Sequence, residues 1–316
     1  MWWIIAAAGA GFAWSVKDTP PQPSPSIALR KPGLWALGAS TTAYVGLAAM
    51  QGFHDRCTDG SYSRSLKKKK EEYILRRSSP LVSHRGLSLT MVGLNLAVFM
   101  HCQSAPRKLW RLADSPSGTW TLLTCAFCHK DIQHLSANMA SLVPEIPHML
   151  QVCGQSPYQF IAFYVSAAIF SSYAQRAVSY IRWTQRWTSR FGVGTPLSMG
   201  ASGVAMAVFA ASCFAQPSWA SPSFLLSTLT LGWQVTNDLN GLFYSDEAIG
   251  FAAHLAGAAF GAMYAYFNAD CYIWSKLVRL FSGIRSGRNL PKPPTQTIHH
   301  DNLDLNEIVR RLNESA

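Results

Sequence analysis

The sequence predicts an all-α membrane protein, and three observations support this prediction. Hydrophobic residues make up 49% of the 316 residues and charged residues only 14%. The apolar residues gather in runs, and a helix that crosses a bilayer needs about 20 mostly apolar residues. These runs lack the amphipathic stripe of period 3.6 that marks helices of soluble proteins. The seven predicted spans are residues 34–53, 86–102, 132–153, 158–174, 199–216, 224–243 and 249–267.

Several of these spans are short or contain polar residues, as expected of helices that line a shared polar cavity. The segment before them is harder to assign. Residues 1–16 are apolar, but no basic segment precedes them, which disfavours a secretory signal. A further span and an incomplete start both stay open. Four prolines at positions 20, 21, 23 and 25 then predict an extended linker.

A polar, basic segment at residues 54–85 separates the first two spans. It contains the run Lys67, Lys68, Lys69 and Lys70. A solvated loop is one interpretation. The alternative is contact with anionic lipid, because basic clusters beside a span lie in the negative surface potential of the bilayer. Both interpretations stay open for this segment, and no nucleic-acid partner is expected.

The seven cysteines are scattered, mostly inside apolar runs, which is typical of small buried hydrophobic residues and not of a disulfide framework. Cys125 and Cys128, followed by His129, match the C-x-x-C-H signature of c-type haem attachment. Five residues with three fixed are a weak signal. We therefore predict no cofactor and no metal, and keep a membrane-tethered cytochrome as an alternative.

Ser202 and His254 are the strongest candidates for chemistry. Each lies among small residues inside an apolar span: Ser202 within Gly-Ala-Ser-Gly at 200–203, and His254 just before Gly257 and Gly261. An ionisable side chain at bilayer depth is costly, so it is a functional-site candidate by default. A serine and a histidine on neighbouring helices make a nucleophile and its general base.

The serine and the histidine can touch only if their helices approach closely, and glycines allow such an approach. Small residues at membrane helix interfaces also often serve packing alone. We expect Gly200, Gly203, Gly257 and Gly261 to let two helices approach closely, as a serine–histidine hydrogen bond of about 2.6–3.2 Å requires. No carboxylate is obviously placed to orient the histidine. Asp238, Asp246 and Glu247 lie near the predicted end of one helix and the start of the next, so a two-member site is the simpler prediction.

His134 and Asn138 are four residues apart and share one face of the helix predicted to start near residue 132. Two interpretations stay open for this pair. The side chains satisfy each other or a neighbouring helix, or both point into the cavity that holds Ser202. In the second case their N–H groups are the donors that a developing oxyanion needs.

These motifs, in this order, resemble the rhomboid family of intramembrane serine proteases, and within it the mitochondrial presenilin-associated type. The resemblance covers roughly residues 30–280 and implies a six-helix core with one additional N-terminal helix. The matching residues are His129, His134-Leu135, Asn138-Met139, Gly200-Ala201-Ser202-Gly203, Ala253-His254-Leu255, Gly257 and Gly261. The implied organisation is an apolar stretch and linker at 1–32, the additional transmembrane helix at 33–53, the basic loop at 54–85, the rhomboid core at 86–268, and a basic, partly disordered tail at 269–316.

The resemblance also implies the roles of the site residues. Ser202 would be the nucleophile and His254 the general base and then acid. His134 and Asn138, with the backbone N–H of Ser202, would bind the oxyanion, whereas His129 looks structural. Met206 stands where many bacterial members have a tyrosine under the histidine, a change expected to alter packing and not to abolish activity.

The implied function is cleavage of transmembrane segments of membrane proteins. Such a segment would enter the site between the second core helix and the helix at 224–243. The rival is an inactive rhomboid-like protein that binds membrane clients; the presence of both Ser202 and His254 favours the enzyme. The implied location is the mitochondrial inner membrane, as a multi-pass protein. The orientation of the protein in the membrane stays open. The basic segments at 54–85 and after 267 favour the matrix for their own side, which would put the N-terminus in the intermembrane space, whereas an imported N-terminus in the matrix implies the reverse.

Overall fold

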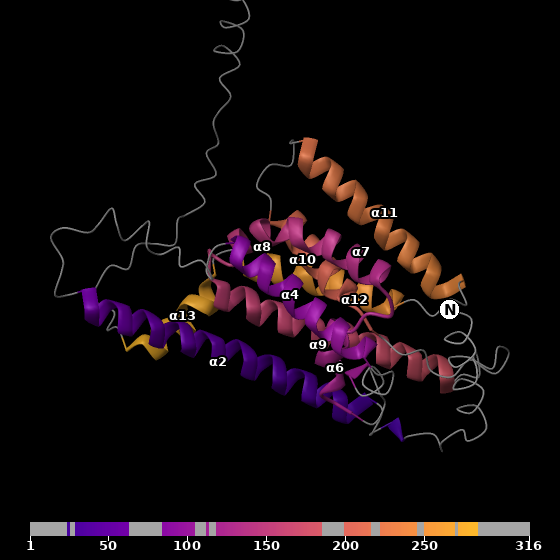
Figure 1. Ribbon diagram of the computed structural model, residues 1–316, viewed down its shortest axis with the longest axis horizontal. Coiled ribbons are helices and arrows are strands. Elements are labelled where there is room, and N and C mark those ends of the chain that lie inside the picture. Colours follow the sequence, from indigo (N-terminus) through magenta and orange to yellow (C-terminus); the bar gives the residue numbers. More distant parts are fainter. Residues whose placement is uncertain are drawn as a thin grey trace, which may run out of the picture.

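The computed structural model describes residues 24–25, 29–62, 84–104, 112–113, 118–184, 199–215, 222–244, 250–268 and 271–283, and the regular structure in these ranges is helical (Figure 1). The predicted all-α class is therefore confirmed. The N-terminal stretch at 1–16 and the four lysines at 67–70 lie outside the described residues. The helices are α2 Lys31–Tyr62, α4 His84–Gln103, α6 Thr121–Thr124, η2 Cys125–Phe127, α7 Ile132–Leu142, η3 Val143–Glu145, α8 Ile146–Val152, α9 Pro157–Thr184, α10 Ser202–Phe214, α11 Pro222–Tyr244, α12 Phe251–Phe267 and α13 Tyr272–Ser282.

Each predicted span coincides with helix in the structure, but the span at 132–153 is not one continuous α-helix. It is divided into α7, the 3-10 turn η3 and α8. Pro144 lies in η3 and Pro147 lies at the start of α8. Proline lacks the backbone N–H and clashes with the preceding turn, which explains why regular helix breaks at these two positions.

Helices α10 and α12 form the centre of the bundle, and small residues bring them together. A Cβ added at Gly257 would collide with the carbonyl group of Gly203, and one added at Gly261 would collide with that of Ala207. Backbone-to-backbone approach of this kind is what small residues allow at helix interfaces. Around this centre, α9 contributes fully buried aromatic side chains, among them Phe160, Phe163 and Tyr164.

Helix α2, 32 residues long, runs along the outside of α9 (Figure 1). Near its C-terminal end α2 also packs against α13, where the indole of Trp274 donates to Gln51 Oε1 at 2.9 Å. Helix α13 was not predicted, since residues 269–316 were assigned to the tail. Left-handed residues at Cys271 and Gly283 limit it to 11 residues, too short to register as a span. The rest of the predicted tail, after residue 283, lies outside the described residues.

Helix α11 is the least enclosed element and leans away from the bundle at the top of Figure 1. Leu231 and Val235 pack with Met206 of α10 and Ala258 of α12. Several of its other apolar side chains are exposed, including Leu226 and Trp233. An exposed apolar helix face fits lipid surroundings better than water.

Among the described residues, α4 is the helix that is both long and apolar enough to cross a bilayer by composition alone, and α10 is apolar but shorter. The other long helices carry polar side chains that the bundle buries, such as Gln159, Ser171 and Arg176. Arg176 donates at 2.9 Å to both the Gly118 carbonyl and Thr121 Oγ1, which fixes the α6 segment to α9.

Candidate active site

Ser202 and His254 meet where α10 and α12 begin. Ser202 is the first residue of α10, and His254 lies in the first turn of α12. Ser202 Oγ and His254 Nε2 are 2.8 Å apart, a hydrogen-bond distance. The close contact of Gly257 with Gly203, one turn deeper, sets the helix separation that this bond needs. Gly203 has a second neighbour, since a Cβ there would lie 2.6 Å from Ser171 Oγ of α9.

Asp238 lies beside His254, a contact that the sequence analysis did not predict. Its carboxylate oxygen Oδ1 lies 3.0 Å from His254 Nδ1, the ring nitrogen that faces away from Ser202. Asp238 is not at the end of its helix but inside α11, which continues to Tyr244. The structure therefore aligns carboxylate, imidazole and hydroxyl from three different helices.

The carboxylate of Asp238 is almost completely buried, with 1% of its surface exposed. Gln234, one turn earlier on α11, donates from Nε2 to the same Oδ1 at 3.2 Å. A buried carboxylate needs such partners. With Nδ1–H donated to Asp238, the neutral imidazole presents Nε2 as the acceptor for the Ser202 hydroxyl. A sequence signal for this residue exists: Asp238 is an ionisable side chain within an apolar span, the same signal that singled out His254.

The turn before Ser202 has an unusual backbone conformation that explains Gly200. The φ of Gly200 is +116°, a region that side chains rarely permit. Two hydrogen bonds hold the turn. The Gly200 N–H donates to the Cys125 carbonyl at 2.9 Å, and the Ala201 N–H donates to His129 Nε2 at 3.4 Å.

His129 is fully buried in the connection between η2 and α7, outside the long helices. Burial, together with the neighbouring His134 ring, lowers the pKa of His129 from the ordinary 6.5 to about 4. The imidazole is thus neutral at physiological pH and can accept the Ala201 N–H. This contact joins His129 to the residue before Ser202 and is compatible with the structural role that the resemblance implied.

His134 and Asn138 converge on the same turn from α7. A Cβ at Gly200 would lie 2.7 Å from His134 Cε1 and 3.1 Å from Asn138 Nδ2. Asp131 starts α7 and accepts the backbone N–H of His134 at 2.7 Å. The Asn138 amide nitrogen is buried and has no hydrogen-bond partner among the described residues. A buried, unpaired donor is costly unless another group accepts its hydrogen bond.

These donors lie beside the N-terminus of α10. The first N–H groups of a helix have no intrahelical partner and carry partial positive charge. A negative charge that develops next to Ser202 would therefore meet helix N–H groups on one side and Asn138 on the other. This arrangement suits the oxyanion of a tetrahedral intermediate.

The remaining sequence motifs have structural explanations. Met206 lies in an apolar cluster between α10, α11 and α12, with Leu231 and Ala258. Cys125 and Cys128 are 1% and 0% exposed, and Cys125 Sγ lies 3.1 Å from Ser172 Oγ. Haem attachment requires thiols that a porphyrin can reach, so this burial disfavours the cytochrome alternative.

Comparison with known proteins agrees with this architecture. Residues 116–270 match the rhomboid domain family. The mitochondrial presenilin-associated rhomboid-like proteins of Rattus norvegicus and Homo sapiens are each 32% identical over 180 residues, which cover 54% of this chain and 44% of each relative. A Danio rerio protein of the same description (protein A) is 30% identical over 174 residues, 52% of this chain and 42% of its own. The match thus spans less than half the length of these relatives.

Over residues 116–270 the chain is therefore similar to the rhomboid domain, which is a multi-pass membrane domain. The relatives that it matches are all described as mitochondrial presenilin-associated rhomboid-like proteins.

Proposed function

We propose that this protein is an intramembrane serine endopeptidase that cleaves transmembrane segments of other membrane proteins. The observation that carries the proposal is the 2.8 Å contact between Ser202 Oγ and His254 Nε2. A hydroxyl held against an imidazole is the arrangement of an activated nucleophile. The proposed catalytic residues are Ser202 and His254, with His134 and Asn138 at the oxyanion and no cofactor.

In the proposed acylation step, Ser202 Oγ attacks the scissile carbonyl carbon while His254 Nε2 takes the hydroxyl proton. The carbonyl oxygen becomes an oxyanion against Asn138, His134 and the Ser202 backbone N–H. Collapse of this intermediate breaks the C–N bond, and His254 returns the proton to the leaving amine. Water, deprotonated by the same imidazole, then attacks the acyl-enzyme, which releases the carboxyl product and restores Ser202.

Asp238 has a positioning role in this proposal. Its bond to His254 Nδ1 fixes the ring and the tautomer, and its charge stabilises the imidazolium that forms during each proton transfer. Because Asp238 belongs to α11, this helix contributes to the site although it leans away from the bundle. We therefore propose a three-group site and not the two-member site that the sequence predicted.

The substrate would enter sideways from lipid, between α7 and the exposed apolar face of α11. A fully hydrogen-bonded helix hides its carbonyl groups, so the segment must unwind locally. Substrates with glycine or proline near the cleaved bond would be favoured, since these residues weaken helices by roughly 1–3 kcal/mol each. We place the protein in the inner mitochondrial membrane, the location that the resemblance implies, and keep 33–53 and 86–268 as the proposed additional helix and core.

A rhomboid-like protein that only binds membrane clients is the second candidate. The two are separated by incubating the purified protein in liposomes with a membrane-spanning reporter that carries helix-weakening residues. We expect wild type to release cleaved reporter and Ser202→Ala and His254→Ala to release none. Full cleavage by Ser202→Ala would refute the assignment. Reporter bound but uncleaved by all three proteins would favour client binding.

A further inference from the structure

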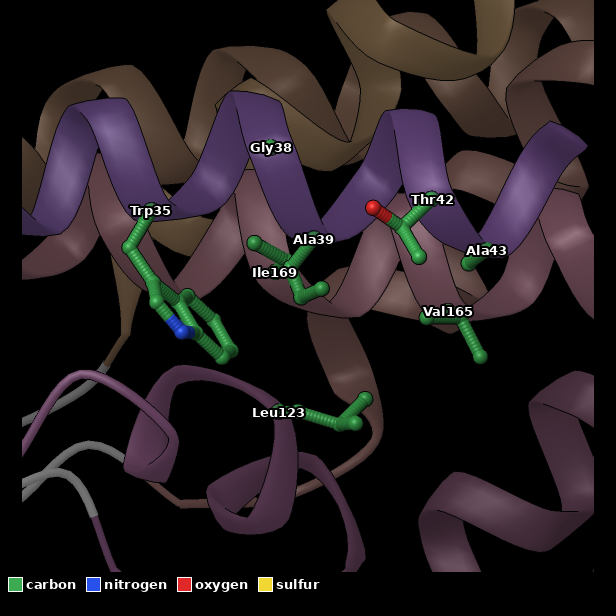
Figure 2. Close-up of a pocket in the computed structure, with 8 residues that line it drawn as sticks. All are labelled: Trp35, Gly38, Ala39, Thr42, Ala43, Leu123, Val165 and Ile169. Atoms are coloured by element: carbon green, nitrogen blue, oxygen red, sulfur yellow. The ribbon is translucent and has the colours of Figure 1, made fainter. Parts of the chain in front are cut away.

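A groove with a volume of about 550 Å³ lies on the outside of the bundle, where α2 passes α6 and α9 (Figure 2). Its walls are apolar apart from the indole N–H of Trp35 and the hydroxyl of Thr42. Gly38 and Thr42 are exposed, so the groove is open to the surroundings of the protein. The lining residues are Trp35, Gly38, Ala39, Thr42 and Ala43 of α2, Leu123 of α6, and Val165 and Ile169 of α9.

The groove is separate from the proposed active site, although both use α9. Ser171 of α9 lies against Gly203 next to the proposed nucleophile. Val165 and Ile169 instead line the groove on the side of α9 that faces α2. A ligand in the groove would therefore contact none of the proposed catalytic groups.

The position and length of the groove match one leaflet of a bilayer. Eight residues separate Trp35 from Ala43, which is about 12 Å along a helix. One leaflet of the hydrocarbon core is about 15 Å thick. Tryptophan side chains gather where hydrocarbon meets headgroups, so the Trp35 end lies at the interface and the Ala43 end lies deeper in hydrocarbon.

A basic residue stands at the interfacial end. Lys31 is exposed and lies four residues before Trp35, on the helix face that also carries Gly38 and Thr42. A lysine in this position extends its ammonium group to the headgroup level. The apolar groove and the adjacent cation together match the two halves of a phospholipid.

We propose that the groove binds one phospholipid, with an acyl chain along Trp35, Ala43 and Val165 and the phosphate beside Lys31. The lipid would fill the space between α2 and the rest of the bundle on the leaflet nearer Trp35. This inference does not depend on the proposed proteolytic activity.

Two glycines of α2 provide a matched test. A Cβ at Gly38 or at Gly46 meets no atom within 4 Å, so a side chain can start at either position without a clash at its Cβ. Gly38 lines the groove and Gly46 does not. We expect wild type and Gly46→Leu, purified in mild detergent, to retain close to one phospholipid per chain by phosphorus assay and native mass spectrometry. Gly38→Leu should lose most of it.

A second pair of variants tests the headgroup contact. Lys31→Gln should lower phospholipid retention, whereas Lys276→Gln, on α13, should not. If Gly38→Leu fails to fold in the same detergent, the Lys31→Gln comparison decides. Equal retention by wild type and the folded Gly38→Leu variant, absence of retained phospholipid from wild type, or retention of a lipid without phosphate would overturn the proposal.

Discussion

At the scale of single residues, the site depends on polar side chains that the fold buries and then pairs. Asp238 is 1% exposed and bonds to His254, and His129 is 0% exposed and accepts the Ala201 N–H. Each of these two side chains also has one buried atom without a partner among the described residues, Asp238 Oδ2 and His129 Nδ1, and the same is true of the amide nitrogen of Asn138. An unpaired donor beside the proposed nucleophile is explained if its partner is the oxyanion, which exists only during the reaction.

Replacement of Asn138 by alanine removes one proposed oxyanion donor. Loss of such a donor lowers the rate by about 10²–10³ in serine proteases. We expect Asn138→Ala to reduce the turnover of a membrane-spanning reporter by that order, with little change in thermal stability. Ser141→Ala is the matched control, since Ser141 is exposed on the same helix and, among the described residues, its hydroxyl donates to the Ala137 carbonyl of its own helix. Equal turnover of the two variants would contradict the oxyanion role.

The low pKa of His129 gives a prediction for stability against pH. The unfolded chain, with an ordinary pKa of 6.5, binds this proton more readily than the folded protein, whose pKa is about 4. The free energy of unfolding is therefore unaffected by this histidine above pH 6.5. As the pH falls toward 4, it decreases by on the order of 3 kcal/mol. As the pH is lowered across this range, the unfolding temperature of the wild type should fall more steeply than that of His129→Gln. If the unfolding temperatures of the two proteins change with pH in parallel, the buried imidazole of His129 is not responsible for the pH dependence.

At the scale of helices, α10 and α12 hold the proposed nucleophile and base at bonding distance because no side chain separates their backbones. Helix α11 completes the arrangement, because it places Asp238 at the second ring nitrogen of the imidazole, Nδ1. The contact between helices, and not any one loop, therefore sets the geometry. A change in the packing of α10 on α12 should alter stability and activity together.

Gly257→Ala tests this dependence. The added methyl would collide with the carbonyl group of Gly203, so the two helices must separate. Overpacking of this kind costs about 1–3 kcal/mol, and we expect a lower unfolding temperature together with reduced turnover. Gly232→Ala on α11 is the control, because a Cβ there meets nothing within 4 Å. That change should be neutral or stabilising by up to about 1 kcal/mol. A Gly257→Ala variant as stable and active as Gly232→Ala would contradict the packing argument.

Sequence patterns anticipated part of this arrangement for physical reasons. Ser202 and His254 were paired because polar groups in apolar spans are costly and because Gly257 and Gly261 permit close approach. The contact of Asp238 with His254 was missed, since it depends on how α11 crosses α12 and not on the extent of α11, which the sequence predicted closely. Helix α13 was missed for a different reason: an 11-residue amphipathic helix leaves no long apolar run. The bond from Ala201 to His129 joins residues 72 positions apart, and no local pattern encodes it.

At the scale of the whole molecule, the helix ends define two poles (Figure 1). The end of α2, the start of α9 and helix α13 meet at one pole, where Gln51 accepts from both Ser156 and Trp274. The starts of α7, α10 and α12 lie at the other pole, with Ser202 and His254. The proposed active site therefore lies near one end of the helices and away from the other.

Two cysteine positions test this polarity in sealed vesicles. Cys57 is exposed near the end of α2, and Lys130, also exposed, precedes α7 at the opposite pole. We expect a membrane-impermeant maleimide to reach Cys57 in wild type and the introduced thiol of Lys130→Cys from opposite faces of the membrane. The other described cysteines are buried or partly buried and should react slowly. Labelling of both positions from the same face would contradict the arrangement of the helices across the bilayer.

The most direct test of the central claim is reaction of the folded protein in liposomes with a fluorophosphonate, which modifies serines activated by a base. We expect one modified residue, Ser202, identified by mass spectrometry, with labelling abolished in Ser202→Ala and His254→Ala. Asp238→Asn should slow the labelling of Ser202 by up to about 10⁴, the effect of the equivalent change in soluble triad enzymes. Asn240→Ala, on the same helix, should leave the labelling rate unchanged. A wild-type protein that stays unlabelled, or that labels equally without His254, would contradict the account.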